Sequence, residues 1–78
     1  MKLNRALYPK QIDTAKLPHW CNWIAQDQDG NWWAYEAEPN EHHMGWYENE
    51  VGRNMKIAKT ATNKNWQTTL INIQQLKV

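Results

Sequence analysis

Three histidines are the side chains of this 78-residue chain that could bind a transition metal. His42 and His43 are adjacent, and with His19 they would supply the three protein ligands that a catalytic zinc site needs. Nothing in the sequence brings His19 close to the other two. We therefore interpret His42 and His43 as solvated residues of a polar loop, and we expect no metal and no other cofactor.

Carboxylates and the single thiol give equally little support for catalysis. Glu36 and Glu38 lie two residues apart and would share one face of a strand, where a solvated surface or ionic contacts with the C-terminal lysines are more common than acid–base chemistry. Cys21 has no base or second cysteine, so it predicts neither a nucleophile, an intrachain disulfide nor a thiolate zinc site. The sequence contains no P-loop, no GxGxxG and no Ser-His-Asp pattern, so we predict that the protein is not an enzyme.

The composition is typical of a soluble cytoplasmic protein. A lone cysteine suits a reducing compartment. The N-terminal residues lack the apolar run of a signal peptide, and no stretch approaches the roughly 20 apolar residues of a membrane span. We expect a cytoplasmic protein without membrane contacts.

Six tryptophans and no phenylalanine are the unusual feature of the composition. Each indole can bury about 150–250 Å², so a few of them make a sufficient core for a chain too short to bury a large one. Six is more than such a core needs. We therefore expect some tryptophans at the rim of a binding surface, where tryptophan and tyrosine are frequent.

Charge is divided unevenly along the chain. Residues 1–20 carry a net charge of +3, residues 21–50 carry −7 with no lysine or arginine, and residues 51–78 carry +5 with no acid. One interpretation is that the basic ends fold over the acidic middle and complement it. The other is that an acidic face is directed at a basic partner.

A β-hairpin over residues 20–38 is the clearest structural signal. An Asp-Gly pair stands between two runs in which apolar and polar residues alternate, and this pattern is typical of a hairpin turn. A three-residue loop that ends at Gly30 pairs Trp23 with Tyr35. A two-residue turn shifts the register by one residue, which exchanges the faces of one strand relative to the other.

The two faces of this hairpin receive different roles. In both registers Trp33 and Tyr35 share one face, which we assign to the core. Trp32 lies on the opposite face, where it is either exposed or covered by the N-terminal segment.

The remaining elements complete an α+β fold in a single domain over residues 1–78. Residues 1–19 form an extended N-terminal arm with one helical turn near residues 12–16. Two further strands follow at residues 45–48 and 55–59. The fold class that we predict is a small twisted antiparallel sheet of three or four strands, with a central tryptophan-rich hairpin and one C-terminal helix over residues 65–76.

The C-terminal helix is predicted from a cap and an apolar stripe. Asn65 is a good N-cap, and Trp66, Leu70 and Ile73 follow at helical spacing. A strand is the alternative, because β-branched residues are frequent in the same segment. These residues are Thr68, Thr69, Ile71 and Ile73.

A partner-binding surface is the functional prediction that follows from these elements. Trp32, Trp46 and Tyr47 are its apolar anchors, since exposed aromatic rings on a sheet are typical of protein interfaces and of stacking on nucleobases. The acids around these anchors repel phosphate and so favour protein over nucleic acid; they are Asp27, Asp29, Glu36, Glu48 and Glu50. The acidic rim of the predicted binding surface consists of Glu36, Glu38, Glu48 and Glu50.

Part of the hairpin resembles a WW domain, in which aromatic side chains on a three-stranded sheet bind proline-rich peptides. The matching residues are Leu17-Pro18, Asp27-x-x-Gly30, Trp33-x-Tyr35 and Trp46. The Asn-His that follows the central aromatic residues in that family is absent. Tyr47-Glu48-Asn49 stands where that family has a proline after its second tryptophan. We interpret the likeness as shared hairpin geometry.

A second resemblance spans roughly residues 20–70. The string WIAQDQDGNWWAYEAEP, the later Gly45-Trp46, and the pattern N-x-x-W-x-x-x-L that starts at Asn63 are similar to small uncharacterised proteins of bacteriophages and prophages. Such a resemblance implies an accessory protein that binds a bacterial host protein, for example a defence component, in the host cytoplasm. The partner that we expect is a host protein with a basic surface.

A nucleic-acid-binding module is the alternative function. It would use stacked tryptophans together with the basic C-terminal region. The basic residues are Arg53, Lys56, Lys59 and Lys64.

Overall fold

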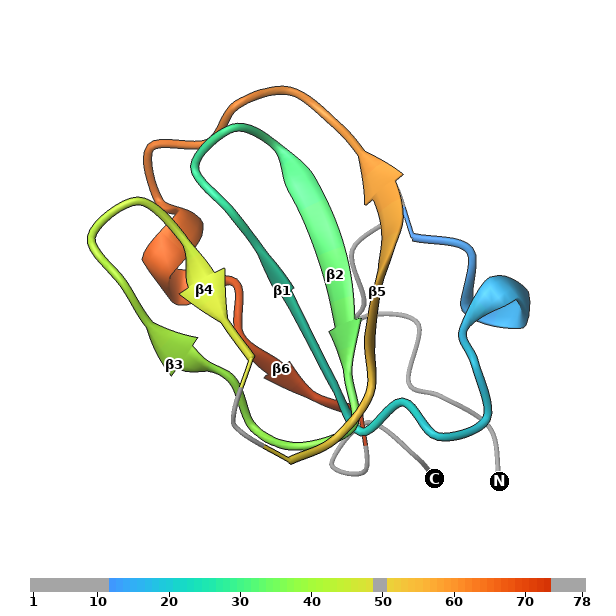
Figure 1. Cartoon of the computed structure of the whole chain (residues 1–78). Helices are drawn as coiled ribbons and strands as arrows, with labels where there is room; N and C mark the ends of the chain where they lie inside the picture. The colour runs from blue at the N-terminus through green and yellow to red at the C-terminus, as the bar shows by residue number, and fades with distance from the viewer. Residues whose placement is uncertain (1–11, 49–50, 74–78) are drawn as a thin grey trace.

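The computed structural model of the chain describes residues 12–48 and 51–73, and within them six strands form two antiparallel sheets (Figure 1). The larger sheet has the strand order β5-β2-β1-β6, and the smaller one is the hairpin β3–β4. The strands are β1 (Trp23–Gln26), β2 (Asn31–Tyr35), β3 (Asn40–Glu41), β4 (Trp46–Tyr47), β5 (Asn54–Lys59) and β6 (Ile71–Asn72). Two 3-10 turns, η2 (Thr14–Lys16) and η3 (Trp66–Thr68), accompany them.

The β1–β2 hairpin has the three-residue loop, so one of the two predicted registers is confirmed. Trp23 pairs with Tyr35, and Gln26 pairs with Trp32. The loop closes through a hydrogen bond of 2.9 Å from the Asp27 N–H to the Asn31 carbonyl. Gly30 makes this loop possible, because its φ of +95° lies in the left-handed region that other residues rarely adopt.

Trp32 lies in the hydrophobic core, which corrects the prediction that it anchors a partner. Its side chain is 5% exposed and packs in one cluster with Ile12, Cys21, Ile24 and other apolar residues. The N-terminal arm therefore covers the Trp32 face, as one of the two predicted alternatives had it.

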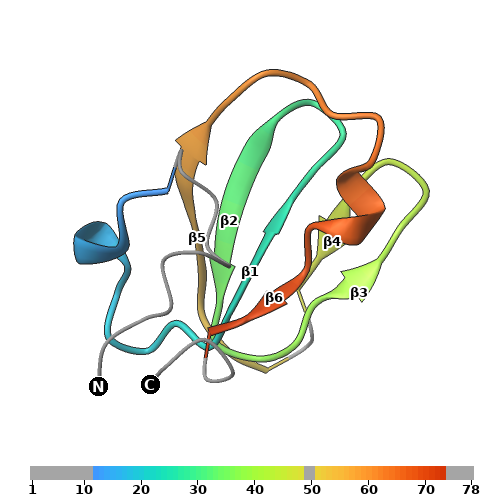
Figure 2. The same ribbon diagram turned by 180° about the vertical axis from the view of Figure 1, so that it is seen from behind.

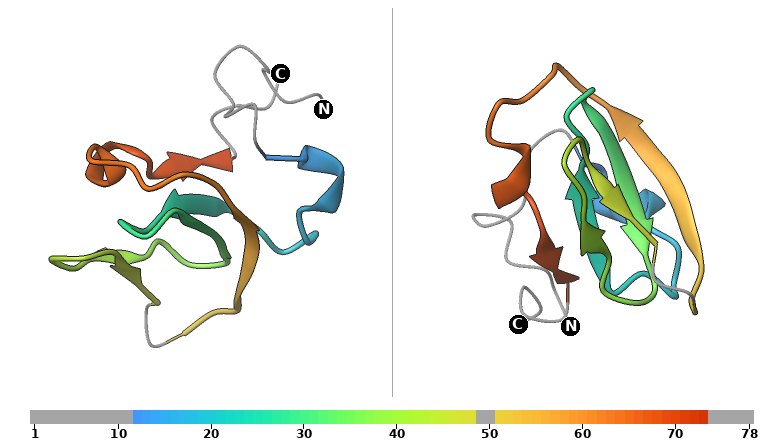
Figure 3. Two further views of the ribbon diagram at one scale, coloured as in Figure 1. Left: turned by 90° about the horizontal axis from the view of Figure 1, so that it is seen from above. Right: turned by 60° about the vertical axis from the view of Figure 1, so that its left-hand side comes forward.

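The opposite face of the hairpin is also covered. Tyr35 is 4% exposed, which confirms it as a buried residue, whereas Trp33 is only half-buried. Alternation along a strand shows which side chains share a face, but what covers each face depends on distant segments. Viewed from above, the β3–β4 hairpin lies on one side of β1 and the η3–β6 segment on the other (Figure 3).

The predicted C-terminal helix is wrong over its described part, and the fold is β-rich rather than α+β. Asn65 precedes only the short turn η3, after which β6 pairs with β1 along the edge of the sheet (Figure 2). The Thr69 hydroxyl accepts a hydrogen bond from the Gln26 N–H at 2.9 Å, and the Ile73 N–H donates to the Asn22 carbonyl at 2.8 Å. The segment therefore supplies hydrogen-bond partners for backbone groups along the open edge of β1. These bonds favour the strand over the helix that the residue spacing predicts. Residues 74–76 of the predicted helix lie outside the described residues.

The other predicted elements are confirmed in outline. The helical turn of the N-terminal arm is η2, and Ile12 beside it is 5% exposed; residues 1–11 lie outside the described residues. The predicted third and fourth strands correspond to β4 and β5, but β4 pairs with β3 in the smaller sheet, so the prediction of a single sheet is wrong. The loop before β4 contributes a strand of its own, β3, which the sequence analysis missed. In the part of the chain that the structure describes, no helix has the length and hydropathy needed to cross a lipid bilayer.

Candidate functional site

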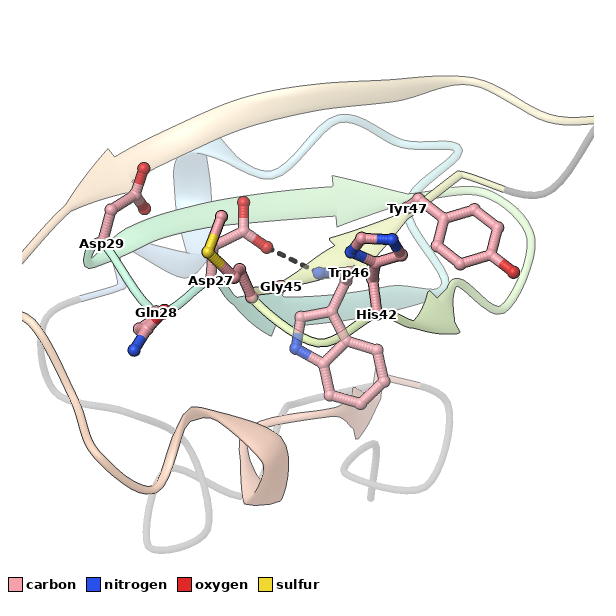
Figure 4. Close-up of a pocket in the computed structure, with 8 residues that line it drawn as sticks. Asp27, Gln28, Asp29, His42, Gly45, Trp46 and Tyr47 are labelled. Carbon is pink, nitrogen blue, oxygen red and sulfur yellow. Dashed lines mark hydrogen bonds between the residues drawn. The ribbon is translucent and has the colours of Figure 1, made fainter.

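An open groove of about 530 Å³ lies between the β1–β2 loop and the β3–β4 hairpin (Figure 4). We call it the hairpin groove. The loop contributes two carboxylates and an amide, and the hairpin contributes two aromatic rings, an imidazole and a methionine. The lining residues are Asp27, Gln28, Asp29, His42, Met44, Gly45, Trp46 and Tyr47.

Short contacts of Asp27 hold the two sides of the groove together. Its Oδ1 atom accepts a hydrogen bond of 2.9 Å from the Trp46 backbone N–H, drawn as the dashed line in Figure 4. A Cβ atom at Gly45 would lie 2.6 Å from the same oxygen, so only glycine allows this close approach. The Gln28 N–H also donates to the Met44 carbonyl at 3.2 Å.

Trp46 fastens the hairpin to the larger sheet. Its indole N–H donates to the Gln26 carbonyl at 3.0 Å, and its ring meets the buried ring of Trp66 edge-on, with the centroids 6.0 Å apart. The β3–β4 hairpin therefore has a fixed position relative to β1.

The rim of the groove is apolar and accessible. Met44 is 61% exposed and Tyr47 is 50% exposed. The Tyr47 ring packs edge-on against His42 with 5.9 Å between the centroids, and this contact limits its freedom. Exposed methionine and tyrosine side chains beside a groove are typical of interaction surfaces.

A second, smaller cavity of about 260 Å³ adjoins the groove and shares Asp27, Trp46 and Tyr47 with it. We call it the aromatic pocket. It is lined by four aromatic side chains, two carboxylates and one amide. These are Trp33, Tyr35, Trp46, Tyr47, Asp27, Glu48 and Asn54.

Negative charge dominates the electrostatics of this pocket. Burial raises the pKa of Asp27 above its ordinary value, and the neighbouring charge of Asp29 adds to that rise, while hydrogen bonding from the Trp46 backbone opposes it. The pKa of Tyr35 is also raised, first by burial and then by the charges of Asp27 and Glu48. Both effects follow from carboxylates gathered in a partly desolvated place.

Within residues 12–48 and 51–73, no lysine or arginine lines either cavity. An ion pair joins Arg53 to Glu36, with 2.9 Å between Nη2 and Oε2. Among the described residues, no ion pair involves Asp27, Asp29 or Glu48. The acidic side chains of the groove and pocket therefore lack a described cationic partner of their own.

One polar group in the pocket wall is left without a partner. The indole N–H of Trp33 is buried and has no acceptor at hydrogen-bonding geometry, although it is close enough to the Asp27 carboxylate to lower the pKa of that group. Unsatisfied buried donors are uncommon in folded proteins.

The structure brings some of the predicted partner-binding residues together and separates others. Trp46, Tyr47 and Glu48 meet in the aromatic pocket. Trp32 is buried, and its indole N–H donates to the Thr60 hydroxyl at 3.1 Å. Glu36 is engaged by Arg53, whose hydrogen bonds to the carboxylate lower the pKa of Glu36 to about 2.

Of the other two rim residues, only Glu38 lies among the described residues. Glu38 is exposed and does not line the groove or the pocket. Glu50 lies outside the described residues.

The sequence analysis missed that Trp33 and Asn54 line the pocket, since it assigned Trp33 to the core. It placed Asp27 in the turn and among the acids around the aromatic anchors, but it did not predict the contact of Asp27 with Trp46. The useful signal was the Asp-Gln-Asp-Gly turn, whose carboxylates must lie at the end of the hairpin near any segment that packs there.

The histidines and the basic residues are the other candidates from the sequence. The rings of His42 and His43 lie 4.0 Å apart, yet no group of three potential ligands that could hold a metal ion is found in residues 12–48 and 51–73. Lys56, Lys59 and Lys64 are exposed, whereas all six tryptophans are buried or half-buried.

Comparison with protein-family models, with curated proteins and with solved structures finds no match for this chain. The site therefore has to be interpreted from its own geometry.

Proposed function

We propose that the protein is a binding module that docks a basic protein partner at the hairpin groove. One observation carries the proposal: the groove and the adjoining pocket combine aromatic rings and a methionine with three carboxylates, and no lysine or arginine of residues 12–48 and 51–73 lines them. The lysine and arginine residues that the structure describes all lie elsewhere; they are Lys16, Arg53, Lys56, Lys59 and Lys64.

The arrangement has the composition of an interaction surface. Aromatic residues and methionine are enriched at the centres of protein interfaces, and polar or charged residues surround them. Met44 and Tyr47 provide the accessible apolar area, while Asp27 and Asp29 provide the charge. Complementary charge of this kind mainly accelerates association and selects the partner.

The resemblance of residues 20–70 to small phage proteins supports a bacterial host protein as the partner. Binding would then act by occlusion, since a bound module covers the basic surface that the host protein needs. This mechanism requires no catalysis by the module itself.

Paired methionine variants test the proposal. Met44 and Met55 are both exposed, at 61% and 44%, but Met44 lines the groove and Met55 lies on β5, on the face of Ala34. A partner is captured from bacterial lysate with the wild type, identified, purified and measured by calorimetry. We expect Met44→Ala and Tyr47→Ala to weaken its affinity at least about tenfold, and Met55→Ala to change it less than about twofold.

Two results would overturn the proposal. One is equal affinity of the purified partner for the Met44→Ala and Met55→Ala variants. The other is capture that nuclease treatment abolishes and that falls steeply between low and moderate salt, because this behaviour indicates nucleic-acid binding.

A further inference from the structure

We propose that the aromatic pocket receives one arginine side chain of the basic partner, an inference that rests on the proposed function and names the group that enters the site. The lining of the pocket carries the argument. Four aromatic rings and two carboxylates line about 260 Å³, and no lysine or arginine in the described part of the chain is among the lining residues.

Aromatic rings and carboxylates attract a cation by two independent effects. The negative face of each ring draws a cation through its quadrupole, and the effect grows when water is excluded. The carboxylates add a Coulomb attraction, which is stronger beside the buried Tyr35 than in open solvent. A neutral or anionic group would gain neither.

Both carboxylates keep acceptor capacity for an incoming donor. The Oδ1 atom of Asp27 accepts the Trp46 N–H, and the Oε2 atom of Glu48 accepts the side-chain amide of Asn54. An ionised carboxylate offers about four lone-pair sites, so each of these groups can accept further hydrogen bonds. Asn54 also fixes the Glu48 side chain at the edge of the pocket.

The raised pKa of Asp27 agrees with this picture. Its charge is disfavoured by burial and by Asp29 in the free protein. A cation in the pocket would reverse that penalty by pairing with the carboxylate.

The same protein shows the favoured chemistry at another place. The Arg53 guanidinium lies 5.3 Å from the centre of the Trp20 ring and donates through Nε and Nη2 to the two carboxylate oxygens of Glu36, at 3.1 and 2.9 Å. This arrangement joins an aromatic face and a forked carboxylate contact on one guanidinium. The aromatic pocket offers aromatic rings and carboxylates as well, and no arginine of the described residues lines it.

Arginine fits better than lysine for geometric reasons. A guanidinium is planar, stacks on aromatic rings and forms two parallel hydrogen bonds to a carboxylate. An ammonium group is a compact and strongly hydrated charge, so it loses more hydration on entering an aromatic pocket.

Titration with matched peptides tests the inference. A capped Gly-Gly-Arg-Gly-Gly peptide is compared with peptides in which lysine or citrulline replaces arginine, since citrulline keeps the shape and removes the charge. Binding is followed by the NMR signals of the Trp33 and Trp46 indole N–H groups. We expect the arginine peptide to bind at least about tenfold more tightly than the citrulline peptide, with lysine between them.

Two variants and a matched control locate the binding site. Tyr47→Leu removes the ring but keeps an apolar contact at a half-exposed position, and Glu48→Gln removes the charge but still accepts from Asn54. Glu41→Gln removes the same charge from β3, outside the pocket. We expect the first two to weaken arginine binding about fivefold or more, and Glu41→Gln less than about twofold.

The outcomes separate this inference from the proposed function. Equal binding of arginine and citrulline, equal binding of arginine and lysine, or equal effects of Glu48→Gln and Glu41→Gln would refute the arginine pocket. The proposal that the groove binds a partner would still be supported if the purified partner binds Met44→Ala more weakly than Met55→Ala. Conversely, arginine binding that depends on Tyr47 supports the pocket even if the methionine test fails.

Discussion

Asp27 joins the turn of the hairpin to both cavities. Its carboxylate accepts the Trp46 N–H, lies against Gly45, and lines the groove as well as the aromatic pocket. The ionised form is disfavoured there by burial and by Asp29. A charge held where it lowers stability is typical of a binding site, because function at such positions often opposes stability.

Asp27→Asn tests whether the charge of Asp27 lowers stability and supports binding. The pKa of Asp27 is higher in the folded than in the unfolded protein. Ionisation of Asp27 therefore does not affect stability below the unfolded pKa, and it destabilises the fold increasingly as the pH rises from the unfolded pKa through the folded pKa. Asparagine keeps the Oδ1 acceptor for Trp46. We expect Asp27→Asn to have a higher Tm than the wild type at pH 7, with the difference shrinking toward acid pH, and to bind arginine peptide about tenfold more weakly.

Calorimetric scans from about pH 7 to about pH 3 provide the measurement. Gln28→Ala, an exposed change in the same loop, is the control and should leave the Tm unchanged. A lower Tm of Asp27→Asn at pH 7 would contradict the role assigned to Asp27.

At the scale of elements, Gln26 ties strand β1 to the segment that follows β5. This glutamine is 2% exposed, and its amide N–H groups donate to the Thr60 hydroxyl at 2.8 Å and the Ala61 carbonyl at 3.2 Å. Its Oε1 atom accepts from the Asn63 side chain at 3.0 Å. The buried side-chain amide of Gln26 therefore helps to fix the position of the loop between β5 and η3.

Gln26→Leu should destabilise the protein through this loop. Leucine has a comparable size but leaves the Asn63 amide and the Ala61 carbonyl without their partner. We expect the free energy of unfolding to fall by about 2–3 kcal/mol, since each unsatisfied polar group costs about 1–3 kcal/mol. Urea denaturation measures this loss, and Gln28→Leu, at an exposed position, should stay within about 0.5 kcal/mol of the wild type. Similar losses in both variants would refute the role of the Gln26 network.

A second contact between elements joins the end of β2 to the start of β5. The Glu36 N–H donates to the Arg53 carbonyl at 2.8 Å, and the Arg53 N–H donates to the Glu36 carboxylate at 2.9 Å. With the guanidinium contacts, these bonds lower the pKa of Glu36 to about 2. The pair is exposed, so its effect on stability is small.

The pH dependence of Glu36 follows from the sign of that shift. A lowered folded pKa stabilises the fold above the unfolded value, and this contribution is lost as the pH falls through about 2. We expect an NMR titration of the Glu36 carboxyl to give a midpoint near 2, and Arg53→Ala to return it toward 4.5, the ordinary value. An unchanged Glu36 midpoint in Arg53→Ala would show that Arg53 is not the cause.

At the scale of the whole molecule, both interpretations of the divided charge have support. Arg53 from the basic C-terminal part pairs with Glu36 from the acidic middle. The acids of the groove and pocket, in contrast, have no described ion pair. Among residues 12–48 and 51–73, charge complementation is therefore partial and leaves an acidic face.

This face predicts how salt affects binding of the purified partner. Exposed charges are screened within about 8 Å at physiological ionic strength, so added salt should lower the association rate much more than it raises the dissociation rate. Stopped-flow tryptophan fluorescence at increasing NaCl measures both rates. Asp29→Asn should flatten the salt dependence of the association rate, and Asp13→Asn, in the segment before η2, should not. Association that is independent of salt would contradict electrostatic steering.

Much of the larger sheet is predictable from the sequence, because its signals are local. Alternation with period two and a glycine at the end of the loop limit the β1–β2 hairpin to two registers, and both place Trp33 and Tyr35 together. The strand β5 follows from a similar short pattern, and so does β4 of the smaller sheet. Of the candidate site, Trp46, Tyr47 and Glu48 are correctly grouped, because they are neighbours in sequence.

Tertiary structure alone decided which register forms, which face holds Trp32, and that Asp27 meets Trp46. The same holds for the C-terminal segment, where helical spacing and β-branched residues compete until the open edge of β1 takes β6 as its neighbour. These outcomes depend on contacts between residues that are distant in sequence, since burial and backbone hydrogen bonding are satisfied only by what packs alongside. The sequence by itself determined the pieces and their faces, and the packing of distant segments determined which faces became core and which became a site.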